Sequence, residues 1–134
     1  METIIKNATA TSPFLEMNSE IGKITINGRA IEYNPTDFWA SIFSWTTDYL
    51  ENPKDITTIN LNFEYINTLS TKELFVFLKL IEFNAAKKTQ VKVNWICDKD
   101  DDDMIDLGDN INALLRNKMN LVEAYEIFET KGDC

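Results

Sequence analysis

The residues best suited to chemistry stand together near the middle of the chain. Residues 67–72, Asn-Thr-Leu-Ser-Thr-Lys, combine a side-chain amide, three hydroxyls and a cation. Residues 56–63, ahead of them, alternate in polarity as a strand does, and from Leu74 the apolar residues recur at helical spacing. A hydroxyl-rich loop between a strand and a helix places its side chains at the positive end of the helix dipole. We expect function to centre on this loop.

Ser70 and Glu73 have the spacing of a capping box. In that motif Ser70 accepts a hydrogen bond from the backbone of Glu73, and the Glu73 side chain reaches back to the cap residue. This pairing gives Ser70 a purely structural role. Thr68 precedes the cap and is not needed for it, so its hydroxyl is expected to be free; an ordinary turn threonine is the alternative.

An acidic run that begins at Asp98 is the second candidate. Asp98, Asp100 and Asp102 have the spacing that opens an EF-hand loop, and Asp109 falls at the twelfth position. Asp103 stands where the loop needs glycine, and the twelfth position needs glutamate. A solvated charge run is therefore favoured over a calcium or magnesium site.

Residues 98–100, Asp-Lys-Asp, also follow a strand as the nucleophile of haloacid-dehalogenase-type phosphatases does. Those enzymes need Thr or Val where this chain has Asp102, and an apolar strand where it has Lys92 and Asn94. An Asp-dependent phosphatase is therefore the weakest alternative. Cys97, at the end of this strand, is expected to be inert because the aspartates beside it raise its pKa.

Bulk properties exclude several classes of function. The chain has 134 residues, a net charge of -9 and no histidine. The negative charge argues against nucleic-acid and anionic-lipid partners, and the lack of histidine removes every His-dependent catalytic or metal arrangement. The N-terminus does not resemble a signal peptide, no stretch has the ~18 apolar residues of a membrane span, and two cysteines make no disulfide framework. A reduced cytoplasmic protein is expected.

Strand and helix patterns alternate along the chain, which predicts a single α/β domain over residues 1–134, with a mixed sheet, an N-terminal hairpin and helices mainly on one face. The helix after Asn34-Pro35 carries an aromatic stripe that is typical of a core face. The expected elements are an irregular or edge-strand segment (9–17), a hairpin turning at Asn27-Gly28 (23–31), a helix ending near Leu50, strands at 56–63, 91–97 and 121–128, and helices from 74 to about 85 and about 104–116.

Residues 65–72, Tyr-Ile-Asn-Thr-Leu-Ser-Thr-Lys, resemble the Tyr-φ-Asn-Thr-Ser-Ser-x-Lys motif (φ apolar) of the SiaC family of bacterial regulatory phosphoproteins. The resemblance extends in order over most of the chain. It includes the family's Thr-and-Pro segment at 9–13, its hairpin at 22–28, its first helix at 38–50, and its strand, acidic turn and acidic-x-Gly segment at 91–108.

This resemblance implies a fold like STAS domains and anti-sigma-factor antagonists, and a regulatory protein that is not an enzyme and needs no cofactor or metal. It implies that Thr68 is phosphorylated by a Ser/Thr kinase of the histidine-kinase-like ATPase type and dephosphorylated by a PP2C-type phosphatase. The unphosphorylated protein would activate a diguanylate cyclase, which controls cyclic-di-GMP and biofilm formation or aggregation. The phosphorylated loop and partner surface would consist of Asn67, Leu69, Ser70, Thr71 and Lys72.

One residue and one segment depart from the family pattern and bear on the identity of the output partner. Leu69 stands in place of the first motif serine, which makes the loop more apolar. Residues 30–34, Ala-Ile-Glu-Tyr-Asn, keep only the asparagine of the family's Ser-Tyr-Pro-Glu-Asn segment. An acidic cation-binding protein or a constitutive protein-interaction module remains the alternative to the phosphoswitch.

Overall fold

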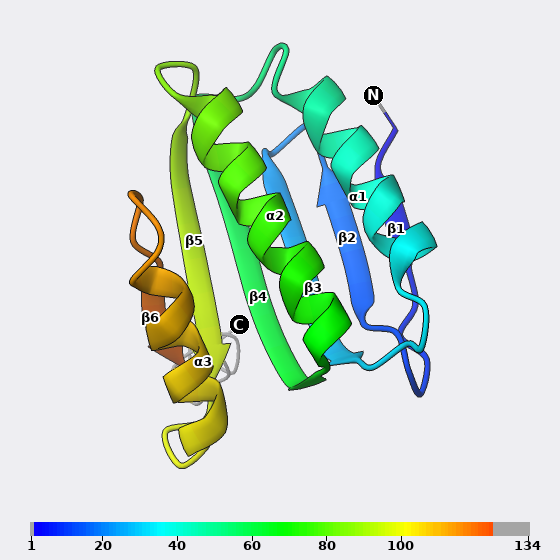
Figure 1. Cartoon of the computed structure of the whole chain (residues 1–134). Helices are drawn as coiled ribbons and strands as arrows, with labels where there is room; N and C mark the ends of the chain where they lie inside the picture. Colours follow the sequence, from blue (N-terminus) through cyan, green and yellow to red (C-terminus); the bar gives the residue numbers. More distant parts are fainter. Residues whose placement is uncertain (1, 125–134) are drawn as a thin grey trace, which may run out of the picture.

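The computed structural model describes residues 2–124, which form one six-stranded sheet with three helices on one of its faces (Figure 1). The strands lie side by side in chain order; β1 to β3 are antiparallel, and β3 to β6 are parallel. This is the predicted fold class. The elements are β1 (Ile4–Lys6), β2 (Phe14–Asn18), β3 (Lys23–Ala30), α1 (Thr36–Tyr49), β4 (Ile56–Ile66), α2 (Thr68–Ala85), β5 (Gln90–Cys97), α3 (Asp102–Asn112) and β6 (Asn120–Glu123).

The strand order explains why the helices share one face. Each parallel connection, through α1, α2 and then α3, moves the chain one strand further in the same direction. Because such crossovers are right-handed, all three helices come to lie on the same side. Within residues 2–124, no helix is long and apolar enough to cross a membrane.

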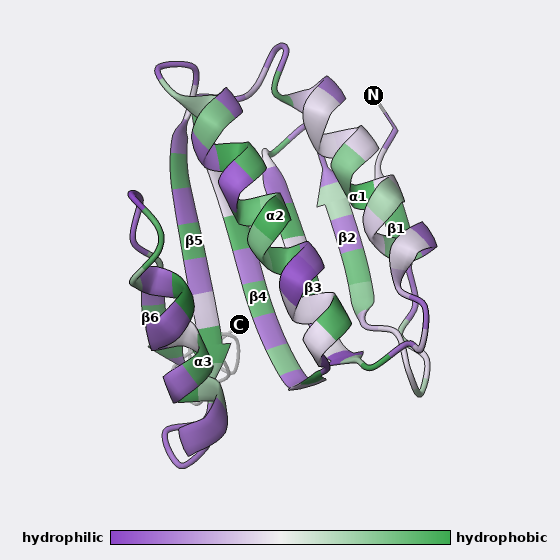
Figure 2. Cartoon of the chain, in the orientation of Figure 1, coloured by the Kyte–Doolittle hydropathy of each residue, from purple (hydrophilic) through white to green (hydrophobic). Residues whose placement is uncertain are grey.

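The opposite face of the sheet is polar. Thr25, Asn60, Asn94 and Asn120 are register partners on four neighbouring strands. The amide nitrogen of Asn94 donates to Asn60 Oδ1 at 2.8 Å, and that of Asn120 donates to Asn94 Oδ1 at 3.3 Å. The hydrophilic and hydrophobic residues of β4 and β5 alternate along the strands in Figure 2. This agrees with the prediction that the helices lie mainly on one face of the sheet.

The core lies between the sheet and the helices. Trp39 of α1 and Phe77 of α2 are fully buried, with ring centroids 6.3 Å apart, and Trp95 of β5 lies beneath α3. The aromatic stripe of α1 was predicted to be core, and the structure agrees, because Trp39, Trp45 and Tyr49 are all buried. None of the three is left on the surface to form a binding groove.

The predicted hairpin is in the wrong place. Asn27-Gly28 lies inside β3, where the register with β4 shifts between Gly28 and Arg29. Gly28 has a φ of 128°, so its conformational freedom serves a bulge rather than a turn. The real hairpin joins β2 to β3 through residues 19–22. Gly22 there has a φ of 65°, and a Cβ on it would lie 2.7 Å from the Ile56 carbonyl oxygen.

Other boundaries also differ from the prediction. Residues 14–18 form β2, which pairs with strands on both sides and is not an edge; the edge strand β1 was not predicted. The first helix begins at Thr36, where Asn34 Oδ1 accepts from the Thr36 backbone at 3.3 Å. The third helix ends at Asn112 instead of near 116. The last strand is shorter than predicted, and positions 125–128 of that prediction lie outside the described residues.

Candidate functional site

The predicted loop at residues 67–72 is the first turn of α2. Asn67 is extended (φ −85°, ψ 173°), and its Oδ1 accepts from the backbone N–H of Ser70 at 2.8 Å, which makes it the N-cap. The predicted capping box at Ser70 and Glu73 is therefore wrong. The reason is that β4 continues to Ile66, three residues beyond the predicted end, so the helix begins at once.

The three hydroxyls of this turn have different surroundings. Ser70 is 1% exposed. The Thr71 hydroxyl donates to the backbone oxygen of Asn67 at 2.8 Å. Thr68, at the first helical position, is exposed, and no hydrogen bond to its hydroxyl is found within residues 2–124. The interpretation that Thr68 is not used in capping agrees with this geometry, although it lies on the helix and not in a loop.

A hydrogen-bonded chain ties this turn to two distant segments. The amide nitrogen of Asn67 donates to the backbone oxygen of Glu32 at 2.9 Å. The Glu32 carboxylate in turn accepts from the hydroxyls of Ser12 and Thr11. The bonds from Ser12 and then from Thr11 hold the pKa of Glu32 below its ordinary value, because they favour the charged form. No sequence spacing pointed to Glu32, which is 35 residues from Asn67.

One residue from each of the two departures from the family pattern, Tyr33 and Leu69, lies on the same part of the surface. Tyr33, in the segment before α1, is 95% exposed, and Leu69 of α2 is 49% exposed. Both line one shallow hollow, together with Pro35 and Lys72. Because Lys72 is four residues after Thr68, the two side chains share one face of α2. The structure thus brings Thr68, Leu69 and Lys72 to one exposed surface and leaves Ser70 inside.

The acidic run begins a helix. The Asp101 side chain accepts from the backbone of Met104 at 3.2 Å and caps α3, and Asp102 and Asp103 occupy the first turn. Carboxylates at this end are stabilised by the helix dipole. The EF-hand alternative is wrong, because the second half of its proposed loop, through Asp109, is helical.

Neither a metal site nor a reactive cysteine is supported by the geometry of the described residues. In the part of the chain that the structure describes, no three His, Cys, Asp or Glu side chains are grouped to hold a metal ion. Cys97 is buried, and this burial, then the charges of Asp101 and Asp98, raises the pKa of its thiol. A high thiol pKa disfavours the reactive thiolate, as predicted.

The described residues thus form an α/β domain with its helices on one face of the sheet and with the exposed Thr68 at the N-terminus of α2. The sequence matches the SiaC family of regulatory phosphoproteins over residues 6–124, and the chain belongs to this family. This confirms the resemblance found from the motif at 65–72. It also makes the protein a regulator rather than an enzyme, so the phosphatase alternative is wrong.

Solved structures with the same fold include SiaC of Pseudomonas aeruginosa. Its apo form has a TM-score of 0.82 and 17% sequence identity, over 91% of this chain and 99% of that chain. A chain from the complex of the diguanylate cyclase SiaD with its activator SiaC, from the same organism, has a TM-score of 0.83 and 17% identity, over 90% and 98%. At this identity the likeness shows the fold. No curated protein sequence matches this chain significantly.

Proposed function

We propose that this protein is a phosphorylation-controlled activator of a diguanylate cyclase. The unmodified form binds the cyclase, and a phosphoryl group on Thr68 releases it. A Ser/Thr kinase of the histidine-kinase-like ATPase type adds the phosphate, and a PP2C-type phosphatase removes it. Membership of the SiaC family and the fold shared with the SiaC that accompanies SiaD support this proposal.

The observation that carries the site assignment is the exposure of Thr68. A kinase must reach the hydroxyl that it modifies, and Ser70 is buried while Thr71 is engaged with the Asn67 backbone. Thr68 alone of the three hydroxyls is exposed. In the transfer, the Thr68 oxygen bonds to the γ-phosphorus of ATP, the bond to ADP breaks, and the hydroxyl proton leaves. The phosphatase adds water and yields inorganic phosphate.

The phosphate acts through charge. It adds about −1.5 to −2 charges and three acceptor oxygens at the start of α2. Within the protein it meets the positive end of the helix and Lys72, one turn away, so the fold tolerates it. At an interface that buries a neutral threonine, an unpaired charge costs several kcal/mol. The modified form is therefore released without any refolding.

The experiment is intact-mass measurement and phosphopeptide mapping of the protein purified from its native host, together with the Thr68→Ala and Thr71→Ala variants. We expect an added mass of about 80 Da in the wild type and in Thr71→Ala, and none in Thr68→Ala. Both forms of the wild type are then tested for binding to the host's diguanylate cyclase. The unmodified form should bind, and the phosphorylated form should not.

Two results would contradict the proposal. Full phosphorylation of Thr68→Ala would move the site to another hydroxyl. An unmodified wild type under every growth condition, with cyclase binding intact, would make the protein a constitutive binding module.

A further inference from the structure

An exposed apolar hollow lies beside the proposed phosphorylation site. Tyr33, which precedes α1, is 95% exposed, and Leu69, in the first turn of α2, is 49% exposed. Both line this hollow together with Pro35, and its volume is about 430 Å³. Lys72 and Glu73 contribute one charge of each sign to its lining, so neither sign is favoured in a partner. The features that distinguish the hollow are the tyrosine ring and the leucine side chain.

The fold brings Tyr33 to the start of α2. Tyr33 follows Glu32, whose backbone oxygen accepts from the side-chain amide of Asn67 at 2.9 Å. Asn67 directly precedes Thr68. A second bond, from the backbone N–H of Asn67 to the Ala30 oxygen at 3.0 Å, holds the same two segments together. Two segments that are 35 residues apart in the chain thus form one surface beside the exposed threonine.

Phosphoryl transfer requires a kinase to cover this surface. The threonine oxygen must first lie about 3–3.5 Å from the γ-phosphorus of ATP, in line for the transfer. Thr68 is the first residue of a helix, and drawing it out as an extended peptide would break the cap that Asn67 provides. The kinase therefore approaches the folded surface. The exposed apolar side chains nearest to the transferred group there are Leu69, one position along the chain, and Tyr33 in the same hollow.

The Tyr33 side chain is well suited to recognition by another protein. Tyrosine supplies a large contact area with few rotatable bonds, and it is enriched among the residues that contribute most to binding. At 95% exposure the ring packs against little of this protein, so a substitution there should leave the fold intact. The whole ring is available to a partner.

We propose that Tyr33 and Leu69 are specificity-determining residues for the kinase that phosphorylates Thr68. The kinase has an apolar pocket, next to the site of its γ-phosphate, that takes up the tyrosine ring and the leucine side chain. It thus recognises two segments of the folded protein and not a linear sequence. This inference rests on the proposed function in taking Thr68 as the phosphoacceptor, and it adds the residues that select the enzyme.

The test measures the steady-state kinetics of phosphoryl transfer to the full-length protein. The enzyme is the Ser/Thr kinase purified from the native host by its activity on the wild-type protein, with ATP as the donor. Tyr33→Ala should raise KM about tenfold and change kcat by less than about twofold, because it removes binding that is equal in the ground and transition states. Leu69→Ala should raise KM in the same direction. Tyr33→Phe, which keeps the ring, should retain the wild-type KM.

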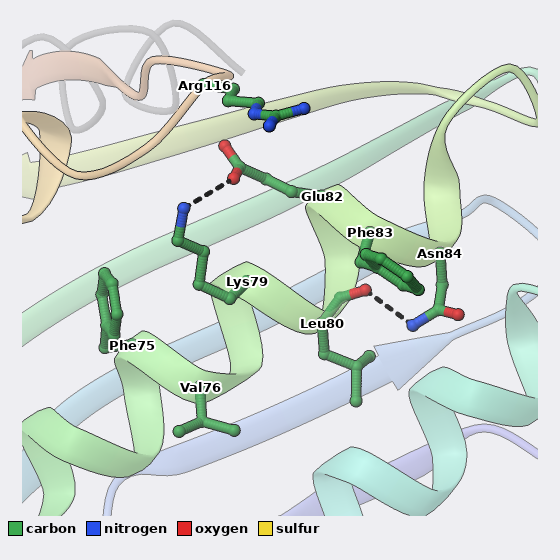
Figure 3. Close-up of a pocket in the computed structure, with 8 residues that line it drawn as sticks. All are labelled: Phe75, Val76, Lys79, Leu80, Glu82, Phe83, Asn84 and Arg116. Atoms are coloured by element: carbon green, nitrogen blue, oxygen red, sulfur yellow. Dashed lines mark hydrogen bonds and ion pairs between the residues drawn. The ribbon is translucent and has the colours of Figure 1, made fainter.

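Phe83→Ala is the matched control. Phe83 is another exposed apolar residue of α2, but it lies 15 residues after Thr68, about 22 Å along the helix axis. It lines a different pocket, together with Phe75 and Leu80 (Figure 3). Its truncation should leave both KM and kcat for phosphorylation unchanged. Circular dichroism checks that each variant is folded.

The possible failures can be told apart. An unchanged KM in Tyr33→Ala, with the wild type phosphorylated on Thr68, would overturn this inference and leave the proposed function intact. An unchanged KM together with weaker binding of the cyclase would assign the hollow to the cyclase instead. An equal rise of KM in Phe83→Ala would show that the effect is not specific to the hollow. A wild type that no host kinase phosphorylates would overturn this inference and the proposed function together.

Discussion

The side chain of Asn67 serves two segments at once. Its oxygen caps α2 through the backbone N–H of Ser70 at 2.8 Å, and its nitrogen donates to the backbone oxygen of Glu32 at 2.9 Å. The residue before the proposed phosphorylation site therefore positions the start of α2 against the segment that leads into α1. Any partner that contacts both Thr68 and Tyr33 contacts a surface whose geometry this amide maintains.

The two bonds of Asn67 can be separated by substitution. Asn67→Asp keeps an oxygen for the cap but loses the donor to Glu32, whereas Asn67→Ala loses both. We expect Asn67→Ala to lower the free energy of unfolding by about 1–2 kcal/mol, and Asn67→Asp by less, because the carboxylate also meets the positive end of α2. Urea denaturation measures the free energy of unfolding of both variants. Equal losses of this free energy in the two variants would show that the cap contributes nothing to stability.

Glu32 makes stability dependent on pH. Its pKa is lowered in the folded protein, so the carboxylate contributes stability above its ordinary pKa, and this contribution is lost as the pH falls through the lowered value. Glu32→Gln should therefore be less stable than the wild type at about pH 7, and the difference should shrink at about pH 3. Urea midpoints at the two pH values test this.

The control for Glu32 is Glu51→Gln, which removes the same charge from an exposed site just after α1. We expect it to change the midpoint little at either pH, because surface charges contribute little. A Glu32→Gln deficit of the same size at both pH values would mean that the lost contact, and not the charge, is responsible.

A negative charge at position 68 should act on binding and not on folding. Thr68→Glu places a carboxylate in the first turn of α2, where the helix dipole favours it by about 0.3–1 kcal/mol. We expect thermal stability equal to or slightly above that of the wild type, together with weaker binding of the cyclase. Calorimetry and a pull-down measure the two quantities. A marked loss of stability would show that charge disrupts the turn, and the release would then be unfolding.

Local patterns predicted the parts of the fold that depend on local contacts. The alternation of Ile59, Leu61 and Phe63 identified β4, and the aromatic stripe of α1 identified the buried face of that helix. Each of these patterns arises from residues within a single strand or helix, so it can be recognised in the sequence. The start of α2 was wrong because Asn67 and Ser70 both satisfy the capping rule. Only the length of β4 decides between them.

The errors and omissions come from contacts between distant residues. Asn27-Gly28 has the composition of a turn, but the pairing of β3 with both β2 and β4 makes it a bulge. The bond between Asn67 and Glu32 spans 35 residues and leaves no periodic trace. The exposure of Val76 and Phe83 became clear only once the helix was placed, because an apolar residue on a helix is usually expected to be buried. The motif predicted Thr68 as the site residue, and it did not predict the surroundings of Thr68.

Gly108 has a packing role that the structure makes testable. It lies on α3 directly over Trp95, and an added Cβ would come within 2.6 Å of Trp95 Cδ1 and Nε1. The indole N–H donates to the Met104 backbone oxygen at 2.9 Å, which holds the ring in place. Gly108→Ala should lower the free energy of unfolding by about 1–3 kcal/mol, although alanine is the better helix former.

The control is Asn110→Ala, at an exposed position of the same helix, which should change the free energy of unfolding by no more than about 0.5 kcal/mol. Urea unfolding followed by tryptophan fluorescence measures both, and a Gly108→Ala variant as stable as the wild type would show that Trp95 moves aside at no cost.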